Sequence, residues 1–228
     1  CWSLVGSEMC IRDRYRLSSQ FIVALLMSTL MLPLLSANTF DISEDTTWSG
    51  NITLDSDVVV ASGSTLTIEP GTVIDGGYGH AIEVLGTLIV ADAHFLSSAS
   101  PTAQSSHGQG LWQGIIVNAG GHATLTNVTI ENANVGVKSY GSLFANELTV
   151  TDAYFAVKNY GQGYLTNLTT DSIDYDAVLN QGDTIIQDAE LTNSSTGIYT
   201  AGTLTATNIN MSHVGTGVVA ISGLATVD

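Results

Sequence analysis

Glycine recurs at a spacing of 20 residues through the second half of the chain. Gly121, Gly141 and Gly161 are 20 residues apart, Gly182 follows after 21, and Gly202 after a further 20. A fixed period of this length indicates one structural unit stacked on copies of itself. The repeat therefore constrains the fold strongly, while it says little about an activity.

Aligning the five segments on these glycines places like residues above one another. The column seven residues after the glycine contains Val128, Leu148, Leu168, Ala189 and Ile209. The column nine residues after it contains Ile130, Val150, Thr170, Leu191 and Met211. A third apolar column, 16 residues after the glycine and displaced by one extra residue in the third segment, contains Val137, Val157, Val178, Ile198 and Val218. The alternation of the first two columns around a polar residue predicts a β-strand with one side in the core.

Turn-forming residues interrupt each segment at one further position, 11 residues after the glycine: Asn132, Asp152, Ser172, Asn193 and His213. Helical repeats do not fit, because Gly, Thr, Asn, Val and Ile dominate and the apolar spacing is two rather than 3.6. We therefore predict an all-β solenoid whose turns stack about 4.8 Å apart, the ordinary spacing of paired strands.

The segment from Gly63 to Phe95 continues the same alternation, and the polar stretch between Phe95 and Leu111 indicates a loop inserted into one turn. About seven turns are expected from Gly63 onward. Residues 38–62 are predicted to form an N-terminal cap, because an exposed first turn invites edge-to-edge aggregation. No polar cap follows the last turn, so residues 63–228 are predicted to be a β-helix cut from a longer protein.

The stretches "LTIEPGTVI", "GTLIV", "LWQGIIV" and "IENANVGV" resemble the right-handed parallel β-helix proteins of the pectin-lyase-like superfamily, from about Trp48 to the C-terminus. More narrowly, they are similar to secreted, surface-associated members with no assigned chemistry. The superfamily includes polysaccharide lyases, glycoside hydrolases, adhesin passengers and phage tailspikes. The resemblance therefore implies a right-handed coil and leaves the activity open.

Residues 1–37 are not expected to belong to the fold. The run from Phe21 to Ala37 is mostly apolar, follows Arg12, Arg14 and Arg16, and ends in small residues, which is typical of a secretory signal peptide. The alternative is an uncleaved membrane anchor, since its 17 residues are at the short end of the spanning range. The preceding "VGSEMCIRDR" resembles translated sequencing-adapter read-through, which has no part in the fold.

Charge and cysteine content narrow the classes of partner. Both cysteines, three of the five basic residues and two of the 21 acidic residues lie within residues 1–37, which leaves 19 acidic and two basic residues beyond them. Such an acidic surface repels nucleic acids and anionic membranes. After cleavage of the signal, we expect a secreted or cell-surface chain that binds neither and has no disulfide or thiol chemistry.

The two remaining basic residues, Lys138 and Lys158, occupy equivalent positions in neighbouring segments, and Tyr140 and Tyr160 follow two residues later. Stacked lysines lower each other's proton affinity, and with the tyrosines they form a candidate contact for an acidic sugar. The alternative is that the lysines point outward and pair with nearby acids, while the tyrosines close a corner.

Asp152, Asp171, Asp174 and Asp176 fall near the same turn in adjacent segments. Three interpretations stay open: a solvated turn, a calcium site with ligands at Asp152, Asp174 and Asp176, and a carboxylate pair of a glycosidase. The five histidines are scattered without metal-ligand spacing. No cofactor other than calcium is expected.

The function expected from these features is that of a structural, adhesin-like surface module that binds polysaccharide, with no catalytic residue assigned. The alternative is a polysaccharide-degrading enzyme, either a lyase or a glycoside hydrolase. An ice-binding face is not supported, because the threonine column Thr129, Thr149 and Thr169 ends at Glu190 and Asn210.

Overall fold

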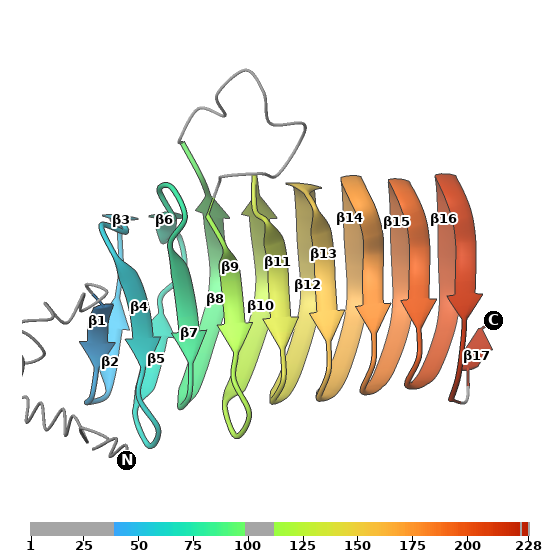
Figure 1. Ribbon diagram of the computed structural model, residues 1–228. Coiled ribbons are helices and arrows are strands. Elements are labelled where there is room, and N and C mark those ends of the chain that lie inside the picture. Colours follow the sequence, from blue (N-terminus) through green and yellow to red (C-terminus); the bar gives the residue numbers. More distant parts are fainter. Residues whose placement is uncertain (1–38, 99–111, 224, 228) are drawn as a thin grey trace, which may run out of the picture. The chain divides into compact units, whose positions relative to one another are not determined.

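A computed structural model describes residues 39–98, 112–223 and 225–227 of the chain (Figure 1). The described residues form 17 strands, and the pairings between them are parallel. The prediction of an all-β parallel solenoid with a repeat of about 20 residues is therefore confirmed. The predicted signal peptide, and nearly all of the loop predicted between Phe95 and Leu111, lie outside the described residues.

Each turn contributes to three sides of the stack, which we call sides A, B and C in the order in which the chain visits them after the repeat glycine. Side A contains β2 (Thr46–Trp48), β5 (Thr65–Ile68), β17 (Ala225–Val227), and the first parts of β8 (Thr87–Leu96), β10 (His122–Glu131), β12 (Ser142–Ala153), β14 (Gln162–Asn180), β15 (Asp183–Thr200) and β16 (Thr203–Ala220).

Side B contains β3 (Asn51–Thr53), β6 (Val73–Asp75) and the parts of the six long strands that follow their first corner. Side C contains β1 (Thr39–Ile42), β4 (Asp57–Val60), β7 (Ala81–Val84), β9 (Gly114–Val117), β11 (Val135–Ser139), β13 (Phe155–Asn159) and the last parts of β14, β15 and β16. Figure 1 shows these strands side by side along one axis, from the blue N-terminal strands to the red C-terminal strands.

The stack has about nine turns, which can be counted along one outward column of side A: Thr47, Thr67, Ile89, Thr124, Phe144, Tyr164, Ile185, Thr205 and Thr226. Residues 38–62, assigned from sequence to a cap, supply β1 to β4, and these strands pair with β4 to β7 in the same parallel register. The first turns of the solenoid therefore come from this segment. The right-handed sense of the coil stays a prediction.

The three predicted apolar columns form the core. In the first column, Val128, Leu148 and Leu168 are at most 1% exposed, and the register pairs Val128 with Leu148 and Leu168 with Ala189. Burial declines in the last long strand, where Val218 is 38% exposed, because β17 pairs only with the first part of β16.

In the five regular turns that begin at Gly121, left-handed backbone marks two corners. The predicted turn column, Asn132, Asp152, Ser172, Asn193 and His213, has φ between 48° and 57° at every position. A second column, which the sequence interpretation missed, has φ in the same range at Asp92, Asn127, Glu147, Asn167, Asp188 and Asn208. Asn and Asp are enriched at such corners because their short polar side chains tolerate this conformation better than most.

The repeat glycines are explained by a close approach between turns. A Cβ on Gly161 would stand well inside van der Waals contact with the carbonyl oxygen of Gly141, and Gly141, Gly182 and Gly202 meet the preceding repeat glycine in the same way. The corner between sides C and A therefore packs backbone directly on backbone, which leaves no room for a side chain.

Candidate functional site

The four residues predicted to contact an acidic sugar do lie together on side C and at its edge. Lys138 and Lys158 are paired in register on β11 and β13, and the rings of Tyr140 and Tyr160 are stacked with their centroids 4.8 Å apart. The Nζ atom of Lys138 lies 5.1 Å from the centroid of the Tyr140 ring. Lys158 makes a different contact, because its Nζ atom lies 3.3 Å from the centroid of the Phe155 ring.

The electrostatic setting of Lys158 is unusual for a surface lysine. Partial burial, together with the positive charge of Lys138, holds the pKa of Lys158 below its ordinary value, while Asp176 acts in the opposite direction. Burial also raises the pKa of Asp176, against the effects of a hydrogen bond from Thr196 and the charge of Lys158. Both shifts disfavour the charged forms, as expected for ionisable groups partly withdrawn from water.

An aromatic cluster borders Lys158, and the sequence interpretation missed it. The ring of Tyr175 lies 4.7 Å from that of Tyr154 and 5.4 Å from that of Phe155, measured between centroids. Tyr175 comes from the segment with the extra residue, where the register between β14 and β15 shifts between Ile173 and Asp176. The predicted extra residue is therefore a bulge, and it brings Tyr175 against aromatic residues of the preceding turn.

The acids of the predicted calcium site occupy different settings. Asp152 lies at a left-handed corner, whereas Asp176 pairs in register with Thr196 beyond the bulge. Asp171, at the end of side B, accepts hydrogen bonds from Thr192 Oγ1 at 2.9 Å and Asn193 Nδ2 at 2.6 Å. Within residues 39–98, 112–223 and 225–227, no group of three or more His, Cys, Asp or Glu residues could hold a metal ion. The calcium site stays a prediction without a supporting cluster.

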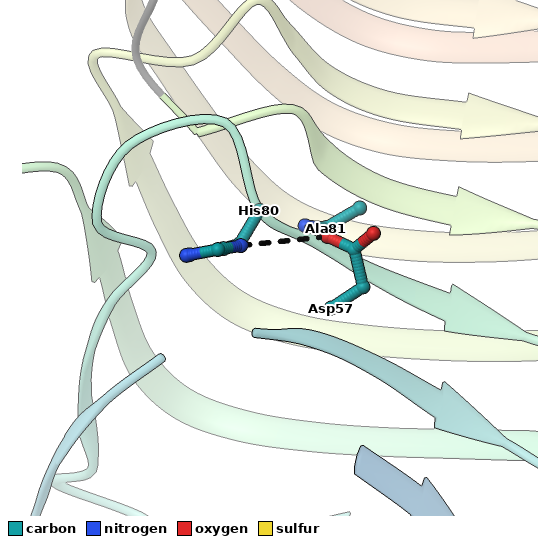
Figure 2. A network of polar contacts seen from close by, with 3 residues as sticks. All are labelled: Asp57, His80 and Ala81. Atoms are coloured by element: carbon teal, nitrogen blue, oxygen red, sulfur yellow. Dashed lines mark hydrogen bonds and ion pairs between the residues drawn. The ribbon is translucent and has the colours of Figure 1, made fainter. Parts of the chain in front are cut away.

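The described histidines occupy separate positions. Figure 2 shows His80 beside Asp57, with 3.6 Å between His80 Nδ1 and Asp57 Oδ1, while the same carboxylate oxygen accepts the Ala81 N–H at 3.0 Å. This network joins the start of β7 to the preceding turn and is structural in character. His94 lies 3.4 Å from Glu131 on side B, and His107 lies outside the described residues.

A groove lies on side A, and its lining comes from the first residues of consecutive long strands. It has a volume of about 620 Å³ and extends over five turns, at the first parts of β10, β12, β14, β15 and β16. Five aligned turns correspond to four strand spacings, or roughly 19 Å along the axis. This groove was not predicted from the sequence, although the two walls of the groove are formed by the columns one and three residues after the repeat glycine.

One wall of the groove is mainly apolar. It is formed by Thr124, Phe144, Tyr164, Ile185 and Thr205. Phe144 and Ile185 are each 42% exposed, which is high for such large apolar side chains. The rings of Phe144 and Tyr164 are nearly parallel, with an angle of 11° and centroids 5.5 Å apart.

The distance between these two rings leaves part of their faces open. Carbon atoms in contact are about 3.5–4.0 Å apart, so the centroid distance implies a sideways displacement of about 4 Å between the rings. Offset stacking of this kind is the preferred arrangement of aromatic pairs. The hydroxyl of Tyr164 donates a hydrogen bond of 2.8 Å to Gln187 Oε1 on the next turn, which fixes the ring direction.

The opposite wall is polar. It is formed by His122, Ser142, Gln162, Asp183 and Thr203, which lie above one another in register. These side chains supply both donors and acceptors of hydrogen bonds. The groove therefore joins an apolar, aromatic wall to a polar wall along the direction of the solenoid axis.

Buried polar side chains support the floor of the groove. Thr184, a floor residue, accepts a hydrogen bond from Asn159 Nδ2 at 2.8 Å and donates one to Asn180 Oδ1 at 2.7 Å. Both asparagines are fully buried. A Cβ on the neighbouring floor residue Gly163 would come within 3.2 Å of Asn159 Nδ2, so this position is tight for any side chain.

Compared with protein-family models, curated proteins and solved structures, the chain gives no significant match. Among the described residues there is also no helix long and apolar enough to cross a membrane.

Proposed function

We propose that this chain is a secreted or cell-surface β-helix module, right-handed and pectin-lyase-like, that binds a polysaccharide chain along side A. The observation that carries the proposal is the pair of parallel walls in the groove, one aromatic and one polar. A sugar ring has an apolar face of C–H groups and a polar rim of hydroxyls, so it complements both walls at once. Pockets of this composition, apolar with a few placed polar groups, are typical of ligand sites.

The direction of the groove favours a linear polymer over a single sugar. Equivalent side chains recur at each turn, so a chain with a regular repeat meets similar contacts along roughly 19 Å. The exposed apolar row also needs a physical reason, since contiguous exposed apolar side chains mark interaction surfaces more often than ordinary surface.

The test is affinity electrophoresis of the full chain through gels that contain a neutral glucan, mannan or xylan. We expect retardation in at least one gel, and the double variant Phe144→Ala/Tyr164→Ala should lose most of it. The matched control is Tyr140→Ala/Tyr160→Ala, which removes a stacked pair of similar size at the edge of side C. Equal loss in both variants, or retardation by none of the polymers, would overturn the proposal.

A second function, a uronate lyase, is favoured by the lowered pKa of Lys158. A lysine with a lowered pKa is a better general base near neutral pH, and Lys138 would neutralise the sugar carboxylate. Incubation with uronate polysaccharides should then give unsaturated products, read by their ultraviolet absorbance, that disappear with Lys158→Ala. A glycosidase is less well supported, because the groove lining contains the single carboxylate of Asp183, whereas that reaction uses a pair.

A further inference from the structure

We infer that the groove on side A selects neutral polysaccharides and rejects chains that carry carboxylate or sulfate groups, with Asp183 as the residue that sets this selection. The inference rests on the proposed function, because it specifies which sugars the same groove takes. The groove is distinct from the Lys138–Lys158 pair on side C, which is the candidate contact for an acidic sugar.

The charges around the groove favour a neutral occupant. Among the described residues that line it, Asp183 is the one carboxylate, and none is a lysine or an arginine. Lys138 and Lys158 lie on side C. An anionic sugar next to Asp183 would meet a like charge without a countercharge, and such juxtapositions are strongly unfavourable at an interface. The net charge of the chain, −16, adds to this repulsion.

His122 does not offset Asp183. The two residues are separated by three turns in the polar wall, with Ser142 and Gln162 between them. Three strand spacings are roughly 14 Å, which exceeds the screening length of about 8 Å at physiological salt. A protonated His122 would therefore act on a different sugar unit from the one beside Asp183.

The carboxylate of Asp183 is also free to accept hydrogen bonds. The side chain is exposed, and within the described part of the chain its carboxylate has no hydrogen bond or ion pair. An ionised carboxylate only accepts hydrogen bonds, and hydrogen bonds to a charged acceptor are stronger than those between neutral groups. Two neighbouring hydroxyls of one neutral sugar fit such an acceptor, while Gln162 and Thr203 on the adjacent turns supply uncharged partners.

The experiment compares two ligands with the same sugar backbone, whose carboxyl groups are ionised in one and methyl-esterified in the other. The full chain is titrated calorimetrically with an oligogalacturonate and with the same oligomer after complete methyl esterification of its carboxylates. We expect roughly tenfold tighter binding of the ester by the native chain. Asp183→Asn should narrow this ratio at least threefold, whereas the control Asp152→Asn, with the same charge change at an exposed corner, should leave it unaltered.

The outcomes distinguish charge selection by Asp183 from polysaccharide binding in the groove. Equal affinity for both oligomers, tighter binding of the free acid, or equal effects of Asp183→Asn and Asp152→Asn would overturn charge selection by Asp183. Binding of the ester that persists in Phe144→Ala/Tyr164→Ala would overturn the groove as the binding site. If neither oligomer binds and the three neutral polysaccharides also fail to bind, both proposals are wrong.

Discussion

The carbonyl oxygen of Gly141 occupies the space in which a Cβ of Gly161 would have to stand. This backbone contact between consecutive turns explains why glycine recurs at the corner between sides C and A. The φ angles of these repeat glycines are not in the left-handed region, so the requirement comes from the close approach and not from backbone conformation.

Gly161→Ala should therefore destabilise the solenoid by roughly 2–4 kcal/mol, because the turns must separate locally to admit the methyl group. The control is Gly217→Ala, where the nearest atom to a new Cβ is Met211 Sδ at 3.7 Å, an ordinary contact. Chemical denaturation followed by circular dichroism measures both. Similar stability of the two variants would contradict the explanation.

A second prediction concerns the hydrogen bonds of the buried asparagines. Asn180→Ala should cost about 2–3 kcal/mol, because Thr184, Thr200 and the N–H of Gly182 all lose a hydrogen-bond partner in the interior. Asn134→Ala, which removes one hydrogen bond to Gln113 at a partly exposed position, should cost less than about 1 kcal/mol. Thermal unfolding at matched pH ranks the two variants, and the reverse order would show that the network contributes little.

The proton affinity of Lys158 should respond to its two charged neighbours in opposite directions. Lys138→Ala removes a like charge that lowers the pKa of Lys158, so that pKa should rise. Asp176→Asn removes the charge that raises it, so the pKa of Lys158 should fall. Titration of ¹³Cε-labelled lysine by NMR follows this directly, since the chain contains two lysines. Shifts of the same sign in both variants would contradict the arrangement.

The core and the corners could be predicted from the sequence because each leaves a periodic trace. Val128 and its equivalents are buried as expected, and the turn column that includes Asn132 has the left-handed backbone that its residue types favour. The second corner was missed because Glu147 interrupts its column of Asn and Asp, and Glu is not a typical turn former.

The candidate site was predicted less completely, for a physical reason. Lys138 and Lys158 could be placed together because equivalent positions in a repeat must stack. The groove depends on outward residues, where threonine and isoleucine flank the adjacent Phe144 and Tyr164, so no single residue type marks the column. The contact between Tyr175 and Phe155 depends on the bulge, whose local direction a count of residues does not define.

Acid should weaken the native state in part through Asp171. Hydrogen bonds from Asn193 and Thr192 hold the pKa of Asp171 below its ordinary value. A carboxyl group whose pKa is lower in the folded than in the unfolded state stabilises the fold at pH values above its unfolded-state pKa. This stabilisation is lost as the pH falls through the folded-state pKa. The stability difference between the native chain and Asp171→Asn should therefore shrink between about pH 5 and pH 2. If denaturation curves showed the same stability difference between the two chains across this pH range, the role of Asp171 would be contradicted.

An NMR titration of the ¹⁵N-labelled full chain with a methyl-esterified oligogalacturonate tests whether a polysaccharide binds in the groove on side A. We expect the largest shift changes at the amides of Phe144, Tyr164 and Asp183, with little change at Lys138 and Lys158. Changes concentrated on side C, or spread evenly over all sides of the solenoid, would contradict the claim.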